Sequence, residues 1–508
     1  MNNSLLSISM EISNKVRFVI SLLLLSILVG QHRGDEIGFQ GVELLYNHSY
    51  KSGFSGMPNS IASNSLSEIF RNPASLASLK KFKISSQNGS FEKLWRERQD
   101  YRPNRQLVTM SFILDGLYTP DINYDGWYDH EAFLDDTTYL VNDPELGLDV
   151  FSEKAADWQR EDSWKNKNSL LIGLPLKLLG KPFVISAYLG NNSFIFDYDR
   201  NQTNLTPHPA WDGYNDLPDR VTGAEDSVRI TWSDYERSRS GPLQSYVVSF
   251  SYGITDRLSL GLSYNKIIGD SEDIQKMKTI GHFDLIDGYN TYKFRYDSLL
   301  VEKKGRSQFD LSYYNLGIII NHESIQFGVN FLLPHSINRE WNYGLTTKST
   351  DSTTVDEIKG NEMMEISYVT TYSIYFRPHE KFAFSSAITK IPFSDAEFDY
   401  SRDSLAYTNW VDQNQFSFGM SYWLFPKTII NAGIKIDSKP FIPDGNAFQD
   451  TGPLTKSIIF GIEKQLFFGT LNVAYEMNNL KYYDVYFSNT NWAYEGSRRI
   501  YFDFTVFF

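Results

Sequence analysis

The amino-acid sequence predicts an all-β protein: a transmembrane antiparallel β-barrel of about fourteen strands with an N-terminal hatch. Three observations lead to this fold class. Apolar and polar residues alternate over long segments, short turns alternate with long polar connections, and a basic, then apolar, segment stands at the N-terminus. Together they describe a chain that is exported and then inserted into lipid as strands.

Segment 498–508 shows the alternation most clearly. Its even-numbered positions from 500 to 508 are all apolar, whereas its odd-numbered positions are mixed. Because alternate side chains of a strand point to opposite faces, one face suits lipid and the other a polar lumen. The terminal Phe508 resembles the aromatic signature by which outer-membrane barrels are recognised, so Phe508 is the predicted assembly signal and the barrel assembly machinery a predicted partner. An edge strand of a soluble β-sandwich remains the alternative interpretation of this segment.

The same alternation recurs along the chain, at 246–252, 258–264, 325–331, 416–422, 430–436 and 471–477. Many of these segments approach the roughly 9–11 residues that a tilted strand needs to cross a bilayer, whereas sandwich strands usually have about five or six. Counting backwards from Phe508 with up-down parity gives fourteen strands, the first near 106–116. A further candidate near 82–90 breaks this parity, and sixteen strands remain possible.

Connection lengths alternate as well. Short turns are predicted near 178–181, 254–256, 321–323, 377–380, 425–427 and 466–468. Long connections are predicted near 117–167, 199–242, 271–307, 341–361, 399–411, 440–454 and 483–497. Short periplasmic turns and longer extracellular loops are typical of outer-membrane barrels. Within the long connections, 227–238 and 290–302 have strand-like sequences that could extend hairpins above the membrane.

The composition agrees with a barrel and excludes several classes of function. Aromatic residues make up 15% of the 508 residues, which is the excess that aromatic girdles at the membrane interfaces would use. The mean hydropathy of −0.36 argues against a helical membrane protein. The absence of cysteine excludes disulfides and thiol chemistry. A formal charge of −13 argues against a nucleic-acid partner, since phosphate binding needs a basic surface.

The N-terminus predicts a signal peptide over residues 1–30. Lys15 and Arg17 precede the apolar run 18–29, which is the order of a basic n-region and an h-region. The run is short for a transmembrane helix, which needs about 20 residues. A buried core helix is the alternative. With export, the predicted location is the bacterial outer membrane.

Residues 31–80 do not alternate and carry a different pattern. Gly38-Phe39-Gln40 is followed by a small-residue stretch at 52–56, and then by Asn72-Pro73-Ala74 and a leucine. This arrangement resembles the FadL family of long-chain fatty acid and aromatic hydrocarbon transporters, and also related barrels of the PorV type. The glycine-rich and acidic positions that the family commonly has before the motif are replaced here by 55–59 and 65–68. An ordinary helix stop at Asn72-Pro73-Ala74 is the simpler interpretation, since proline ends helices.

The resemblance implies a hatch over 31–80, with Asn72, Pro73 and Ala74 near the barrel wall, and a barrel over 81–508. It implies passive uptake of hydrophobic small molecules such as fatty acids. The alternative that it leaves open is a PorV-like role in protein secretion or surface attachment, with a secreted protein held by the extracellular loops. A general porin is disfavoured, because a hatch would block the channel.

The first long connection contains a calcium-loop pattern. Asp121, Asn123 and Asp125 occupy positions 1, 3 and 5, a glycine follows at 6, the Trp127 carbonyl stands at 7 and Asp129 at 9. The acid expected at position 12 is missing. Segment 117–167 has 13 Asp and Glu against four Lys and Arg, so an acidic, metal-free turn is the alternative to a calcium site.

No catalytic pattern emerges from the sequence. The eight histidines are scattered, and no serine–histidine–acid order stands out, so the chain is predicted not to be an enzyme. Charges on predicted lumen faces, at Lys435, Asp437, Glu463 and Glu476, either line a pore or neutralise one another.

Overall fold

In the computed structural model, the described residues are 38–39, 41–42, 65–99, 148–209, 228–286, 291–296, 298–400, 410–443, 451–486 and 489–508. They form an almost entirely β structure with three short 3-10 helices, η3 (Leu66–Phe70), η4 (Pro73–Ser78) and η7 (Phe393–Asp395). Within these ranges, no helix is long and apolar enough to cross a membrane.

Fourteen antiparallel strands close into a barrel, because the first strand pairs with both the second and the last. In order around the wall they are β1 (Lys83–Gln99), β2 (Trp158–Leu178), β3 (Lys181–Pro209), β4 (Val228–Gly253), β5 (Leu258–Ile286), β7 (Leu300–His322), β8 (Ile325–Leu332), β11 (Val369–His379), β12 (Phe382–Ile391), β14 (Gln413–Phe425), β15 (Thr428–Ser438), β16 (Leu454–Gln465), β17 (Gly469–Tyr486) and β18 (Asn489–Phe507). Closure leaves no open edge for lipid to meet, so every wall strand has two hydrogen-bonded neighbours. The predicted fold class and strand number are confirmed.

The outer surface of the wall is an apolar belt. Large hydrophobic side chains point outward from every wall strand except β1, and examples are Leu174, Leu189, Phe250, Leu262, Leu316, Phe327, Ile374, Ile388, Phe418, Ile434, Phe460, Leu471 and Phe502. Alternate residues of the same strands are buried inside the barrel. An outward apolar face of this extent is stable only in contact with lipid.

The first strand lies elsewhere than predicted. β1 covers Lys83–Gln99, whereas the sequence favoured 106–116, which lies outside the described residues. β1 contains the further candidate near 82–90, which the count from Phe508 leaves out because it breaks the parity. Its outward positions Ser86, Asn88, Ser90 and Glu92 are polar, so it lacks the apolar alternation of the other strands. The neighbouring β18 contributes apolar side chains to the belt beside it.

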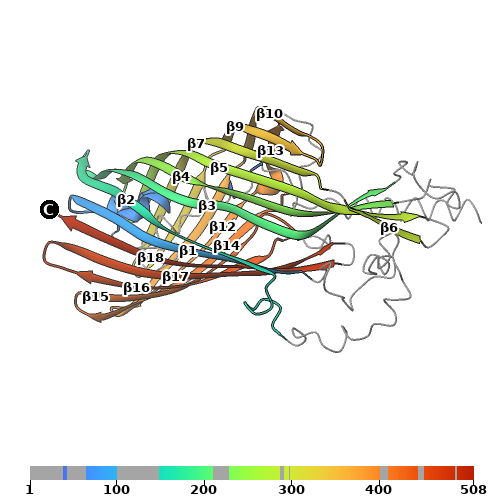
Figure 1. Cartoon of the computed structure of the whole chain (residues 1–508). Helices are drawn as coiled ribbons and strands as arrows, with labels where there is room; N and C mark the ends of the chain where they lie inside the picture. The colour runs from blue at the N-terminus through green and yellow to red at the C-terminus, as the bar shows by residue number, and fades with distance from the viewer. Residues whose placement is uncertain are drawn as a thin grey trace, which may run out of the picture.

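The two ends of the barrel differ (Figure 1). Short turns and the C-terminus lie at one end, together with η3 and η4, whereas β3, β4 and β5 run far beyond the belt at the other. There β6 (Thr291–Tyr296) pairs with β5. β9 (His335–Lys348), β10 (Thr353–Ile366) and β13 (Glu397–Tyr400) form a sheet continuous with β7. By the usual arrangement, the short-turn end is periplasmic and the other end extracellular.

Three neighbouring chain segments break at one level of the wall. β8 ends at Leu332 and β9 begins at His335, β10 ends at Ile366 and β11 begins at Val369, and η7 separates β12 from β13. The register shows that these breaks face one another, since Leu332 pairs with Val369 and His335 with Ile366. The sheet above the belt is therefore offset from the wall below it.

Candidate functional site

Residues 65–79, called the docked segment, lie inside the barrel at its periplasmic end, and Asn72 joins them to the wall. The Asn72 Nδ2 donates to the main-chain oxygens of Ile318 (3.2 Å) and Val329 (3.1 Å), which lie opposite one another on β7 and β8. The Asn72 Oδ1 accepts from the Ala74 N–H at 3.0 Å and caps η4. One side chain thus starts the helix and fixes it to two strands.

Pro73 and Ala74 lie directly on the wall because two glycines face them. Gly261 and Gly317 pair across β5 and β7. A Cβ on Gly261 would lie 2.2 Å from the Ala74 nitrogen, and a Cβ on Gly317 would lie 2.1 Å from the Asn72 Oδ1. Ser251, opposite Gly261 on β4, donates to the Pro73 oxygen at 2.5 Å. The predicted hatch motif therefore sits on a complementary row of small inward-facing residues.

The docked segment also reaches another part of the wall. The Gln87 Nε2 on β1 donates to the Ser67 Oγ at 2.9 Å and to Asp503 on β18 at 3.0 Å. Apolar side chains of η3 and η4 pack on β2, β3 and β4 in a cluster of Leu66, Ile69, Phe70, Leu76, Leu79, Leu171, Val184, Tyr188 and Val247. The segment is thus attached to strands from β1 to β8, and it occupies the periplasmic end of the lumen.

A cavity of about 650 Å³ remains beside η4 at this end. It lies between the docked segment, at Ala74, Ser75 and Ser78, and the turns that join β7 to β8 and β11 to β12. Its other lining residues include Asn321, Gln326, Tyr375, Arg377 and His379. The Arg377 guanidinium lies 4.3 Å from the Trp423 ring centre. This cavity is a largely polar space next to the docked segment.

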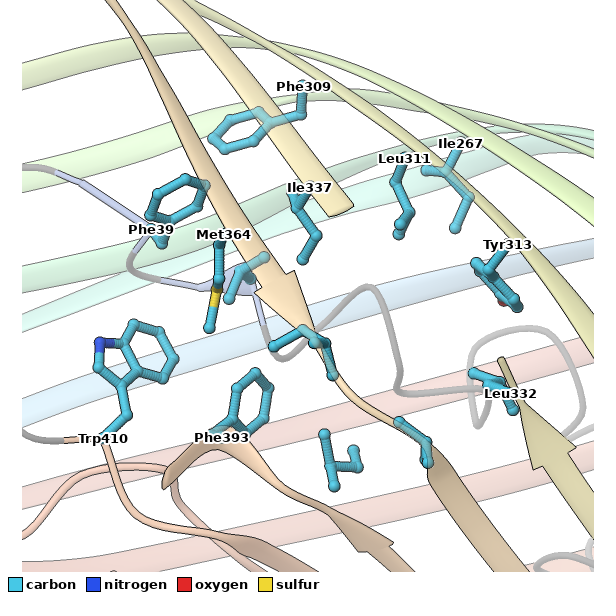
Figure 2. Close-up of a cluster of buried hydrophobic side chains, with 14 of the residues drawn as sticks. Phe39, Ile267, Phe309, Leu311, Tyr313, Leu332, Ile337, Met364, Phe393 and Trp410 are labelled. Carbon is cyan, nitrogen blue, oxygen red and sulfur yellow. The ribbon is translucent and has the colours of Figure 1, made fainter. Parts of the chain in front are cut away.

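One side of the lumen towards the extracellular end, lined mainly by β4 to β12, is apolar. Its buried residues form the lumen cluster (Figure 2): Phe39, Val42, Leu243, Ile267, Phe309, Leu311, Tyr313, Leu332, Ile337, Met364, Ile366, Val369, Ile391, Phe393 and Trp410. They come from β4, β5 and β7 to β12, together with η7, two residues of the N-terminal region, and Trp410 just before β14. A general porin has a polar, water-filled lumen, so this interior is of a different kind.

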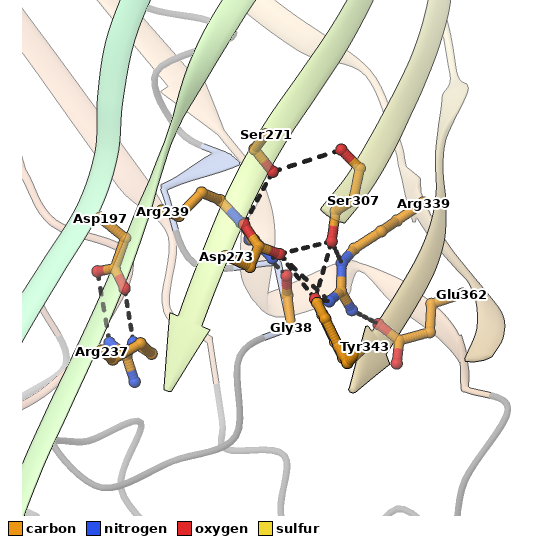
Figure 3. Close-up of polar contacts among 10 residues, drawn as sticks. All are labelled: Gly38, Asp197, Arg237, Arg239, Ser271, Asp273, Ser307, Arg339, Tyr343 and Glu362. Atoms are coloured by element: carbon orange, nitrogen blue, oxygen red, sulfur yellow. Dashed lines mark hydrogen bonds and ion pairs between the residues drawn. The ribbon is translucent and has the colours of Figure 1, made fainter. Parts of the chain in front are cut away.

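A buried ion network covers the lumen cluster on its extracellular side (Figure 3). Arg239 on β4 makes two hydrogen bonds to Asp273 on β5, of 3.0 and 2.9 Å, and donates to the Gly38 oxygen at 2.6 Å. Its guanidinium also lies 4.9 Å from the Phe309 ring centre. Arg239 therefore ties the N-terminal region, next to Phe39, to the upper wall.

The charges of this network compensate one another. Ser307 and Tyr343 donate to the Asp273 carboxylate at 2.6 and 2.7 Å, and Arg339 pairs with Glu362. Burial alone would raise the pKa of Asp273, but the Arg239 guanidinium, aided by Arg339, holds the pKa at about 2. Asp273 is therefore ionised at every physiological pH.

The lumen charges singled out in the sequence are largely paired. Lys435 contacts Asp437 at 2.6 Å, and Glu476 accepts from the Tyr501 hydroxyl at 2.8 Å and lies 3.8 Å from Arg499. Lys435, Asp437 and Glu476 are each buried. These contacts favour a neutralised interior over a charged pore.

The other predicted sites have different outcomes. Phe508 lies at the short-turn end, where its N–H donates to the Phe82 oxygen at 3.0 Å; its role as assembly signal stays a prediction. Asp121, Asn123, Asp125, Trp127 and Asp129 lie outside the described residues, so calcium also stays a prediction. Among the residues that are described, no three histidine or carboxylate side chains gather as a metal site.

Sequence reasoning missed the lumen cluster and the ion network. The cluster's members are spread from Phe39 to Trp410, and they read simply as the inward positions of separate strands. One signal was present in the sequence: along β7, the inward positions change from the large apolar residues Phe309 and Leu311 to a glycine, Gly317. Without the register, nothing connected that change with the Asn72 motif.

The fold is similar to that of several solved structures. A Pseudomonas aeruginosa FadL homologue aligns over 90% of this chain and 97% of its own, with a TM-score of 0.53 and 12% identity. The Pseudomonas putida toluene transporter TodX aligns over 91% and 97%, with a TM-score of 0.50 and 11% identity. A deletion mutant (deltaS2S3) of the TodX monoaromatic hydrocarbon channel aligns over 90% and 98%, with a TM-score of 0.51 and 11% identity. No protein-family model and no curated protein matches the sequence.

The closed barrel and its apolar belt define an outer-membrane β-barrel protein. More particularly, the fold is that of the FadL-type transporters and hydrocarbon channels, which confirms the resemblance expected from the Asn72-Pro73-Ala74 region at the level of fold. These similar structures are described as a transporter and a channel.

Proposed function

We propose that this protein takes up hydrophobic small molecules passively across the outer membrane. The observation that carries the proposal is the lumen cluster, an apolar interior in a barrel whose periplasmic end is occupied by the docked segment. Fatty acids and aromatic hydrocarbons are the candidate compounds, since similar structures include a toluene transporter. Calcium in the first extracellular loop is proposed as a structural ion only.

The arrangement of the lumen suggests a route. A hydrophobic molecule would enter from the extracellular end and bind among the side chains around Phe309 and Phe393, where transfer from water is favourable. It would then pass the docked segment beside Ala74 and leave through the polar cavity lined by Arg377. Because the docked segment contacts so much of the wall, we expect its displacement to limit the rate.

Uptake by whole cells tests this function. A bacterial strain without its own uptake of a labelled alkane or fatty acid would express the full chain or one of two matched variants. Leu311→Gln places an amide in the lumen cluster, whereas Leu316→Gln places one on the outer face of the same strand. Burying an amide without partners costs about 1–3 kcal/mol, so Leu311→Gln should lower uptake about fivefold or more. Equal uptake by cells with and without the protein would contradict the proposal.

A second candidate function is that of a PorV-like barrel that holds a secreted protein. The observation in its favour is the length of β3, β4 and β5. These strands have 26 to 29 residues each, and they extend beyond the belt. Such a platform offers a docking surface outside the membrane. Retention of a secreted protein by purified barrel, with no effect of Leu311→Gln on any uptake, would favour this function instead.

A further inference from the structure

Between the docked segment and the lumen cluster, the inner wall carries a polar patch. It consists of Ser249 on β4, Ser263 and Asn265 on β5, Tyr313 and Asn315 on β7, and Asn330 on β8. The register makes these residues neighbours, because Ser263 pairs with both Ser249 and Asn315, and Asn265 with Tyr313. Asn330 pairs with Gly317, the next inward residue of β7.

The inward face of β7 shows how the patch relates to the rest of the lumen. Gly317 lies against Asn72 and Pro73 of the docked segment. Asn315 and Tyr313 follow in the patch, and Leu311 and Phe309 continue in the lumen cluster. Tyr313 belongs to both, since its ring packs in the cluster and its phenol carries the polar atom (Figure 2). The patch is therefore the polar boundary of the apolar lumen cluster.

Four polar atoms of the patch have no hydrogen-bonding partner among the described residues. They are the Tyr313 Oη, the Asn315 Oδ1, the Asn330 Oδ1 and the Ser249 Oγ. All four residues are buried, with at most 4% of any of them exposed. Buried polar groups nearly always find a partner in protein, water or ligand. Two of the four atoms are carbonyl oxygens, which can only accept, so the patch calls for a partner that donates.

The patch is also uncharged. On the inward faces of β4, β5, β7 and β8, all described at this level, no charged side chain lies between the docked segment and the far side of the lumen cluster. The first ones reached are Arg239 and Asp273, which already bind one another. A carboxylate placed at the patch would be buried without a cation from these strands, which is strongly unfavourable.

We propose that this patch binds the head group of the transported molecule, and that the preferred substrates are uncharged amphiphiles with a hydroxyl or similar donor, such as long-chain alcohols. The hydroxyl donates to the Asn315 or Asn330 Oδ1 and accepts from the Tyr313 phenol. The hydrocarbon tail extends into the lumen cluster. This assignment rests on the proposed uptake function and adds to it a discrimination between neutral and charged head groups.

Competitive binding to the full-length protein tests the assignment. Protein purified in a mild detergent is equilibrated with equal amounts of dodecan-1-ol and its methyl ether, or of dodecan-1-ol and dodecanoate, and the bound species are read by native mass spectrometry. The alcohol should be preferred over the ether about fivefold, the effect of about one neutral hydrogen bond. It should also be preferred over dodecanoate.

Two lumen variants and one control locate the effect. The double variant Asn315→Leu, Asn330→Leu removes both acceptors and should bring the alcohol-to-ether ratio close to one. Tyr313→Phe removes a donor that both compounds can use, so it should weaken the binding of both and keep the ratio at about five. Tyr314→Phe, whose side chain points outward from the same strand, should keep the fivefold ratio. Retention of the heat-modifiable mobility of a folded barrel in gel electrophoresis shows that each variant is folded.

The outcomes separate this proposal from the proposed function. Equal binding of alcohol and ether by the unaltered protein would overturn the head-group assignment, leave hydrophobic uptake standing, and assign the patch to bound water. A preference that persists in the Asn315→Leu, Asn330→Leu double variant would overturn it as well. If neither the alcohol nor the ether binds, the proposed uptake function itself is wrong.

Discussion

Replacing Asn72 by alanine should loosen the docked segment. The change removes two hydrogen bonds to the wall, at 3.2 and 3.1 Å, and the cap on the Ala74 N–H at 3.0 Å. A neutral hydrogen bond contributes about 1 kcal/mol and an N-cap about 1 kcal/mol, so the loss is about 3 kcal/mol. At about 1.4 kcal/mol per tenfold, opening of the segment becomes roughly 100-fold more frequent.

Hydrogen exchange on the full-length protein in detergent measures this opening. The reporters are the N–H groups of Ser75 and Leu79, which bond within the segment at 3.1 and 2.9 Å. Their protection from exchange should fall roughly 100-fold, whereas the protection of the wall strands should not change. Asn88→Ala is the matched control, since the Asn88 side chain bonds only its own neighbour Gly89. Unchanged protection of Ser75 and Leu79 in Asn72→Ala would refute the reasoning.

Three further predictions concern other contacts. Gly261→Ala places a Cβ 2.2 Å from the Ala74 nitrogen and should displace the docked segment and raise single-channel conductance, whereas Gly253→Ala, with its nearest contact at 3.4 Å, should not. The pKa of Asp273 falls from 3.8 to about 2 on folding, so its ion pair contributes about 2 kcal/mol to the free energy of unfolding above pH 4, and this contribution is lost as the pH falls towards 2. Asp273→Asn should remove this part of the pH dependence in acid unfolding curves. Identical curves for the variant and the unaltered protein would contradict the prediction. Asp121→Ala, which removes the ligand at position 1, should abolish calcium binding measured by isothermal titration calorimetry; equal heats from the variant and the unaltered protein would leave the calcium site without support.

Much of the wall could be predicted from the sequence because each strand has two different environments. Lipid outside and a packed lumen inside impose alternation, and closure with short turns imposes parity, so the strand number follows from the pattern. β1 is the informative exception. Ser86, Asn88 and Ser90 face outward, so β1 lacks the apolar outer face of the other strands, and the candidate near 82–90 is left out of the count because it breaks the parity. Its place depends on pairing with β18 and β2, which is a tertiary property.

The functional site, too, could be predicted from the sequence only in part. Asn72-Pro73-Ala74 could be found because a local motif stood in a region without alternation. Its partners Gly261 and Gly317 could not, since glycines are common on inward faces and only the register of β5 against β7 brings these two together. The lumen cluster depends in addition on the facing chain breaks near Leu332 and Val369, which no periodicity reveals.

Photoaffinity labelling tests most directly whether the lumen binds hydrophobic molecules. The full-length protein would be exposed to a hydrocarbon that carries a diazirine, illuminated, and mapped by peptide mass spectrometry. The account predicts labels on lumen residues such as Phe309, Leu311 and Phe393, and competition by the unlabelled hydrocarbon. Labels confined to outward residues such as Phe418 and Phe460, without competition, would show contact with the surrounding lipid phase alone and would contradict the account.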